Sequence, residues 1–301
     1  MIVPETYSTT TRVLALSNYC GVTPRLFEAL MRRFLTLEAV YSAGPAAFME
    51  IDGVSRLQAD QLARATERLS EAEAIVKSLV ARDIVLLTRF DEAYSHLLFE
   101  LNDPPALLYL RGNSIDVSGR TIAVVGTRSA STQGIELTSR LVKELARQNV
   151  QIISSLLGGI DSAVHLAARS VGGKSFAVID CGIDRISQSE GIPLAIDIIQ
   201  TGGVVSEYAP DVAAGPKTMS ESNRLIVGLA QAVVVTEVYA HSEKTLDLLQ
   251  ACRDIGKLAF VMIDPHYGAL ADPTSLAQAH EYGAIPIEGL DKVGDIVRSL
   301  V

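Results

Sequence analysis

Three consecutive residues, Gly126, Thr127 and Arg128, form the strongest candidate for chemistry in this sequence. They follow the apolar run Thr121–Val125 and precede a segment with helical periodicity. A strand that ends at glycine and leads into a helix directs backbone N–H groups and the positive end of the helix dipole at a ligand above the sheet, usually a phosphate. The planar guanidinium of Arg128 suits phosphate oxygens. The alternative is a glycine that only relieves crowding between strand and helix.

A second glycine turn follows the apolar run at residues 150–153. It includes Ser154, Gly159, Asp161 and His165. Paired glycines permit a tight turn and a close approach of the backbone to a ligand. Asp161 is placed to cap a helix, with His165 one turn further along the same face. Capping and ligand contact are compatible, so both interpretations stay open.

Two further segments place polar side chains where helices are expected to begin. Asn223 and Arg224 start one predicted helix, although cations are favoured in the last turn of a helix. A cation in the first turn of a helix is thus an exception, and it makes Arg224 a candidate functional residue. The alternative interpretation is that Arg224 forms an ion pair with Glu207. Lys244 and Thr245 open another predicted helix, at a position where hydroxyl groups often meet phosphate.

Short runs rich in valine and isoleucine alternate with amphipathic segments from Ile84 onward. This alternation predicts βα units and a mostly parallel sheet covered by helices on both faces, an α/β fold. Ligands of such sheets bind outside the carboxyl ends of the strands, which is where we expect the working residues. The predicted strands are residues 121–126, 150–153, 175–180, 203–207, 232–237, 258–263 and 284–287.

The N-terminal part of the chain has a helical period instead. We predict a small all-α domain over residues 1–80, followed by the α/β domain over residues 84–301. Residues 51–55 resemble half of a helix-hairpin-helix, in which a glycine turn brings backbone amides to a phosphate, and residues 20–24 have a similar outline. Both lack the usual second glycine. A glycine that only turns the chain between packed helices is therefore the favoured interpretation.

Composition limits the function classes. The 301 residues are 48% hydrophobic and carry a net charge of −9, which argues against a protein that grips nucleic acid over its whole surface. A local basic groove remains compatible with this charge. The three cysteines, Cys20, Cys181 and Cys252, are far apart and predict reduced thiols rather than metal ligands. No apolar run has transmembrane length and no signal peptide is evident, so we expect a cytoplasmic protein without membrane association.

Several motifs occur together in a characteristic order. They are IAVVGTR, SxxxxGIDxxxH, CGIDR, SEY, NRLIxGL and a helix that opens at Thr245, and they follow the segment DEAYSHLLFELNDPPALLYLRGN. In order and spacing this set resembles the DprA/Smf family of DNA-processing proteins. The resemblance is close from Asp91 to Met262 and looser over the helical N-terminal part.

The resemblance implies an extended Rossmann-like fold that binds single-stranded DNA, forms homodimers and loads RecA recombinase during natural transformation. It implies no catalysis and no cofactor. Carried over by position, Arg128 contacts a backbone phosphate, and Ser154, Gly159 and Asp161 shape the adjoining pocket. Asn223 and Arg224 line the same groove.

The sequence departs from the family pattern where basic residues are expected. Met219–Ser222 replace an aromatic-proline-basic run, and Gly158 stands at a position that is often basic. Glu243–Thr245 replace a Ser-Gly-Ser turn. These changes reduce positive charge or reshape the phosphate turn, and each lost phosphate contact weakens binding. We also expect the chain to close with a helix over Asp291–Leu300 rather than a winged-helix segment.

Two alternatives to DNA binding remain open. In the first, Asp161, Glu207 and Glu237 face a nucleotide on a lysine-decarboxylase-like scaffold, and the protein is a nucleotide sensor or hydrolase. The sequence shows no metal-ligand cluster and no serine–histidine–acid arrangement that would support catalysis by spacing alone. In the second, the protein is a divergent relative that acts through protein contacts.

Overall fold

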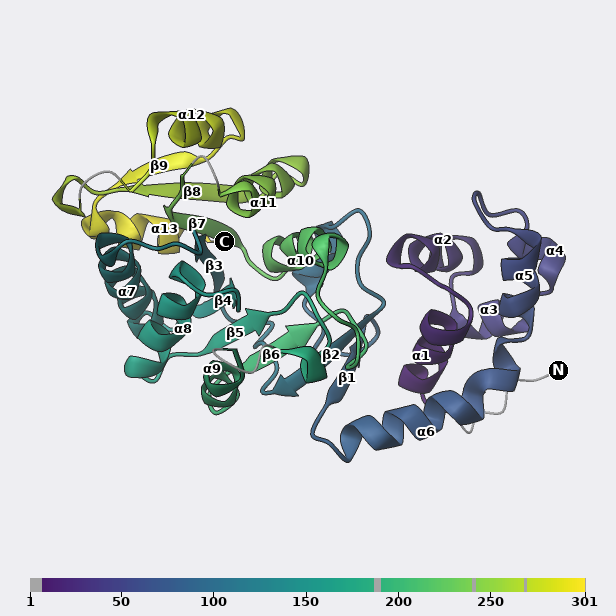
Figure 1. The fold of residues 1–301 in the computed structure, drawn as a ribbon. Coiled ribbons are helices and arrows are strands. Elements are labelled where there is room, and N and C mark those ends of the chain that lie inside the picture. Colours follow the sequence, from purple (N-terminus) through teal and green to yellow (C-terminus); the bar gives the residue numbers. More distant parts are fainter. Residues whose placement is uncertain (1–6, 187–190, 240–241, 268–269, 301) are drawn as a thin grey trace. The chain divides into compact units, whose positions relative to one another are not determined.

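The computed structural model describes residues 7–186, 191–239, 242–267 and 270–300. The chain divides into two compact units (Figure 1). The first comprises Met1–Tyr94 and Asn102–Tyr109, and the second comprises Ser95–Leu101 and Leu110–Val301. The expected domain boundary at residues 80–84 falls inside the first unit, between its last helix and its first strand.

The first unit is built mainly from short capped helices. Thr23 and Ser55 each accept a hydrogen bond from a backbone N–H of the helix that follows, so each caps the first turn of that helix. Phe27, Leu30 and Phe48 are completely buried between the helices. The elements are α1 (Thr9–Tyr19), α2 (Pro24–Phe34), α3 (Leu37–Ser42), α4 (Pro45–Phe48), α5 (Arg56–Ala63), α6 (Leu69–Val80) and β1 (Val85–Thr88).

The second unit alternates strands and helices, as the hydrophobic periodicity predicts. Strand β2 (Leu107–Gly112) begins in the first unit and ends in the second. The remaining elements are β3 (Thr121–Gly126), α7 (Thr132–Arg147), β4 (Gln151–Ser155), α8 (Ile160–Ser170), β5 (Ser175–Val178), α9 (Gly191–Ile198), β6 (Gly203–Ser206), α10 (Pro216–Gly228), β7 (Ala232–Glu237), α11 (Glu243–Asp254), β8 (Leu258–Ile263), α12 (Pro273–Glu281), β9 (Ile285–Glu288) and α13 (Val293–Ser299).

The strand order places a topological switch point beside β3. Over the described residues the order is β1-β2-β6-β5-β4-β3-β7-β8-β9, and every pairing from β6 to β9 is parallel. The chain runs outward from β3 through β4, β5 and β6, then returns to place β7 on the other side of β3. Ligands of open parallel sheets bind at such a reversal, beyond the carboxyl ends of the strands.

Helices cover both faces of this sheet, which confirms the predicted α/β class (Figure 1). Helices α7, α8 and α13 pack on one face, and their apolar side chains meet those of β3, β4 and β7 in one buried cluster. Ile122, Leu141 and Val234 in this cluster are completely buried. Burial of roughly this kind stabilises by about 1.5 to 3 kcal/mol per large aliphatic side chain. Helices α10, α11 and α12 lie on the other face (Figure 1).

The seven strands predicted from the sequence are all present, and two more precede them. Strands β1 and β2 lie in a segment for which the periodicity gave no strand prediction. Across the described ranges, no helix is long and apolar enough to cross a membrane. Cys20, Cys181 and Cys252 are buried free thiols.

Candidate phosphate-binding site

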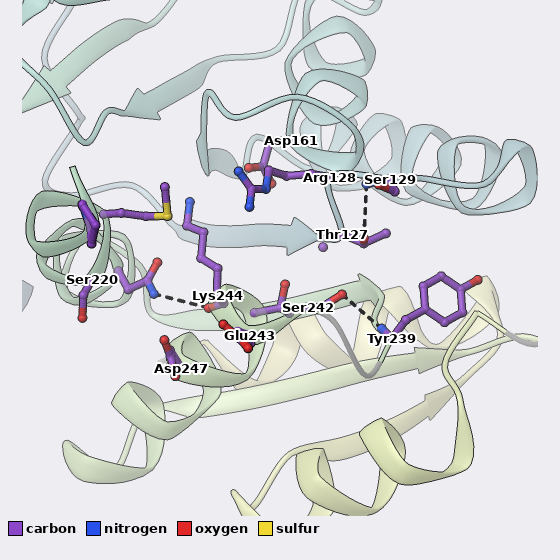
Figure 2. Close-up of a pocket in the computed structure, with 15 residues that line it drawn as sticks. Thr127, Arg128, Ser129, Asp161, Ser220, Tyr239, Ser242, Glu243, Lys244 and Asp247 are labelled. Carbon is purple, nitrogen blue, oxygen red and sulfur yellow. Dashed lines mark hydrogen bonds between the residues drawn. The ribbon is translucent and has the colours of Figure 1, made fainter. Parts of the chain in front are cut away.

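A cavity of about 570 Å³ lies beyond the carboxyl ends of β3 and β7, at the N-terminus of α11 (Figure 2). This is the place that the strand order favours for a ligand. Its walls come from four segments: the turn after β3, the start of α8, helix α10 and the stretch that leads into α11. The lining residues are Gly126, Thr127, Arg128, Ser129, Asp161, Pro216, Met219, Ser220, Asn223, Tyr239, Ser242, Glu243, Lys244, Thr245 and Asp247.

The turn after β3 is fixed by backbone hydrogen bonds on both sides. The N–H of Thr127 donates to the carbonyl of Glu237 at 3.0 Å, and the N–H of Ile160 donates to the carbonyl of Thr127 at 3.1 Å. The Thr127 hydroxyl accepts from the N–H of Ser129 at 3.3 Å (Figure 2). The turn is therefore a rigid support for the side chain of Arg128.

The N-terminus of α7 is closed by a carboxylate of the chain itself. Glu237 is 1% exposed, and both of its carboxylate oxygens accept from the N–H of Ser131, at 3.2 and 3.0 Å. The hydroxyl of Tyr239 donates to the same carboxylate at 2.9 Å. A carboxylate here compensates the positive end of the helix dipole. This differs from the expectation that α7 directs its first N–H groups at a phosphate.

Arg128 is exposed and points into the cavity (Figure 2). Within the part of the chain that the structure describes, no hydrogen bond or ion pair engages its guanidinium. Its charge is close enough to Lys244 to contribute to lowering the pKa of that ammonium. Two cations thus face one cavity, and Arg128 is available to an anion.

Lys244 is held over the end of β4 by a relay of hydrogen bonds. Its Nζ donates to Ser155 Oγ at 3.0 Å, and Ser155 Oγ donates in turn to the carboxylate of Asp161. Burial lowers the pKa of Lys244, while the charge of Asp161 opposes that shift. Burial likewise raises the pKa of Asp161, and the charge of Lys244 opposes it. The two side chains are thus connected through one hydroxyl, and each opposes the effect of burial on the other.

Asn223 lies on the cavity wall beside this pair. Its Nδ2 donates to the backbone carbonyl of Lys244 at 3.3 Å, which links α10 to α11. Its Oδ1 is buried and has no hydrogen-bond partner in the described structure. Buried amide oxygens normally have a donor, so this atom marks a place where a ligand or water would complete the wall.

Arg224 does not reach the cavity. Its Nη2 contacts both carboxylate oxygens of Glu207 at 2.6 Å, so the ion-pair alternative describes its surroundings. The prediction that Asn223 and Arg224 begin a helix is wrong, because α10 begins at Pro216. Proline is favoured in the first helical turn, and the hydroxyl of Thr218 accepts from the N–H of Gly215 to cap it.

The remaining predicted residues divide into wall and support. Gly126, Thr127, Arg128, Asp161, Asn223, Lys244 and Thr245 line the cavity. Ser154 and Gly159 lie behind them: Ser154 Oγ donates to the carbonyl of Val124 at 2.7 Å, and Gly159 packs against the backbone of Arg128. The sequence prediction missed Tyr239, whose position after β7 was the available signal, and the acidic Asp247; Glu243 lines the cavity as part of the expected phosphate turn.

The carboxylates required by the enzyme alternative are mostly engaged elsewhere. Of Asp161, Glu207 and Glu237, only Asp161 lines the cavity. Glu207 is paired with Arg224, and Glu237 caps α7. Among the described residues, no group of three or more potential metal-ligating side chains comes together.

His165 supports the site from the core. Its Nε2 lies 2.9 Å from the carbonyl oxygen of Ser155, and its Nδ1 lies 3.1 Å from Ser175 Oγ. The ring is 1% exposed, and burial lowers its pKa to about 4. The imidazole is therefore neutral at pH 7 and joins the ends of two strands.

The pKa of His165 predicts a loss of stability in mild acid. Between about pH 6.5 and pH 4 the unfolded chain binds a proton at this residue and the folded chain does not, so stability falls as the pH falls. The difference amounts to about 3 kcal/mol across that window. Urea unfolding at pH 7 and pH 4.5 measures it. His165→Gln should flatten the profile, whereas His280→Gln, at an exposed position on α12, should not; identical profiles for wild type and His165→Gln contradict the prediction.

Comparison with known proteins shows which family the chain belongs to. Residues 85–280 match the family model of DNA recombination-mediator protein A. The chain belongs to this family. The predicted DprA/Smf resemblance is thereby confirmed.

Relatives in the DNA recombination-mediator protein A family match only part of their length. Protein Smf from Synechocystis sp. is 29% identical over 228 residues, and DNA processing protein DprA from Streptococcus pneumoniae is 36% identical over 152 residues. These matches cover 74% and 50% of this chain. They cover 57% and 54% of the two relatives, so the chain spans little more than half the length of each.

Solved structures in the family share the fold. DNA processing protein A from Streptococcus pneumoniae has a TM-score of 0.77 at 22% identity, covering 98% of this chain and 99% of that chain. The protein from Helicobacter pylori has a TM-score of 0.62 at 20% identity, covering 72% of this chain and 97% of that chain. The extended Rossmann-like fold that the resemblance implied is thus confirmed.

Proposed function

We propose that the second unit binds single-stranded DNA by holding a backbone phosphate between Arg128 and Lys244. The observation that carries this proposal is Arg128: a guanidinium on a rigid turn, without a counter-ion in the described residues, aimed into the cavity that Lys244 also lines. Guanidinium groups bind phosphate oxygens in bidentate geometry. A phosphate there would also receive the favourable field at the N-terminus of α11.

The proposed DNA contact is weakly cationic. Glu243 and Asp247 line the same cavity and oppose the two cations. Binding through one phosphate gives a shallow salt dependence, with a slope of log K against log salt of about −0.7 for a single strand. A tenfold increase in salt should therefore weaken binding only about fivefold.

The family supports DNA as the ligand. Relatives are named DNA processing proteins, and the structure from Helicobacter pylori is that of a protein described as having a unique single-stranded DNA binding mode. By analogy, we propose that this protein protects incoming strands and loads RecA recombinase during natural transformation, as a homodimer in the cytoplasm. Light scattering tests the homodimer, and assembly of RecA filaments on the bound strand tests the loading of RecA.

Fluorescence anisotropy on a labelled oligo-dT strand tests the DNA proposal. The wild-type protein should bind at roughly 25 mM salt, and log K should fall with a slope of about −0.7 as salt increases. Absence of binding at the lowest salt contradicts the proposal and favours the alternative in which the protein acts through protein contacts.

A further inference from the structure

The turn from β3 into α7 has the setting of a nucleotide site. It lies beside the switch point of the sheet, where doubly wound folds place the diphosphate of a nucleotide at a helix N-terminus. Helix α7 has 16 residues, and the N–H groups of Thr132 and Gln133 in its first turn have no intrahelical acceptor. Helix ends of this kind attract anions. Left open, this turn would suit a free nucleotide.

A carboxylate of the chain itself lies at this helix end. Glu237 ends β7, the strand that pairs with β3 across the switch point, and it is 1% exposed. Both of its carboxylate oxygens accept from the N–H of Ser131, at 3.2 and 3.0 Å, and the hydroxyl of Tyr239 donates to it at 2.9 Å. Burial and this carboxylate both raise the pKa of the Tyr239 hydroxyl, so the hydroxyl stays a donor. Glu237 is thus fixed where an anion would bind.

Gly134 provides the space for this carboxylate. It is the third residue of α7, although glycine is unfavourable inside a helix. A Cβ at this position would overlap Oε2 of Glu237 and lie 3.1 Å from Oε1. The carboxylate could not move aside without breaking its hydrogen bonds to Ser131 and Tyr239. Gly134 and Glu237 therefore belong to one arrangement.

We propose that Glu237 is a specificity-determining residue that excludes free nucleotides from the N-terminus of α7. The diphosphate of a nucleotide would meet a buried like charge at close range, where water screens it poorly. A phosphate beside Arg128 and Lys244 would instead lie toward α11. This inference rests on the proposed DNA-binding function, to which it adds selection of a strand backbone over mononucleotides.

Removal of the carboxylate should open the helix end to an added anion. Inorganic pyrophosphate, which stands in for a nucleotide diphosphate, is added to Arg128→Ala and to Arg128→Ala/Glu237→Ala during thermal unfolding. The Arg128→Ala background removes the contribution of the proposed DNA site. At about ten times its dissociation constant, pyrophosphate should raise the Tm of the double variant by about 3 to 6 °C. The Tm of Arg128→Ala alone should change by less than about 1 °C. Formate, a free carboxylate, should also raise the Tm of the double variant.

Two further variants separate an opened site from a change in net charge. Glu136 is an exposed carboxylate on α7, so Glu136→Ala removes the same charge and should gain no shift with pyrophosphate. Gly134→Ala, added to Glu237→Ala, places a methyl group in the vacated space and should abolish the shift. With Glu237 present, Gly134→Ala should lower the Tm because the new Cβ overlaps the carboxylate.

The proposal is overturned by equal shifts with and without Glu237, or by a shift that Gly134→Ala leaves intact. If Glu237→Ala does not fold, Glu237→Gln replaces it, because the amide keeps the volume and an acceptor for Tyr239. This variant should gain a smaller pyrophosphate shift, and no shift in it also overturns the proposal. Binding of oligo-dT is measured separately on the wild type. Binding there without an opened anion site leaves the DNA proposal standing, whereas absence of binding overturns the DNA proposal whatever pyrophosphate does.

Discussion

Replacement of Arg128 by alanine should weaken binding of single-stranded DNA by about 1 to 3 kcal/mol, since a charge-assisted contact to phosphate is lost. The variant should fold normally because the guanidinium is exposed and, among the described residues, makes no hydrogen bond or ion pair. It should also reduce the salt slope by up to about 0.7 units, the contribution of one phosphate on a single strand. Anisotropy on oligo-dT over a salt series measures both quantities.

Arg147→Ala provides the matched control for this experiment. Arg147 is an exposed arginine at the opposite end of α7 from the cavity, with a side chain that is 64% exposed. Arg147→Ala removes the same charge from the same unit. It should change the affinity by no more than a few tenths of a kcal/mol, and it should change the salt slope by less than the contribution of one phosphate. Equal losses in the two variants would mean that net charge, rather than a contact at Arg128, governs binding.

The cavity residues could be predicted largely because the ends of buried parallel strands can be located in the sequence. Apolar runs such as residues 121–126 and 232–237 are easily recognised, and whatever follows them must lie at one edge of the sheet. Arg128, Asp161 and Lys244 therefore meet although they are far apart in sequence.

The pairing of side chains could not be predicted in the same way. Glu237 caps α7 from a position 106 residues away from Ser131, and no local pattern reports such a contact. The start of α10 was misplaced because Pro216–Ser220 carries no apolar face that would mark a first helical turn. Strand β2 was missed because its leucine-rich run suits a buried helix as well as a strand.

The surroundings of Asp180 could not be predicted from the sequence either. Its position after an apolar strand is visible in the sequence, but the lack of a hydrogen-bond partner for its Oδ2 is a property of the packed structure. Burial and hydrogen-bond saturation depend on neighbours from several elements, so an unpartnered carboxylate oxygen emerges only once those elements are assembled.

The backbone of the turn that carries Arg128 packs closely against Gly159. Alanine substitutions at Gly158 and Gly159 test whether this contact positions the turn. Gly158 and Gly159 both have positive φ, +92° and +59°, so alanine strains the backbone at either position. Beyond that strain they differ. A Cβ at Gly158 meets nothing within 4 Å, whereas a Cβ at Gly159 would lie 2.2 Å from the carbonyl oxygen of Arg128 and 2.5 Å from that of Thr127.

Gly158→Ala should therefore cost about 1 kcal/mol of unfolding free energy, and Gly159→Ala about 2 to 4 kcal/mol, because overpacking adds to the same strain. The added cost falls on backbone atoms that cannot move without displacing the turn. Gly159→Ala should thus also weaken DNA binding to the level of Arg128→Ala, while Gly158→Ala should bind like wild type. Urea unfolding and anisotropy on the same preparations measure the two effects. Equal behaviour of the two variants would show that φ strain alone matters and that Gly159 does not position Arg128.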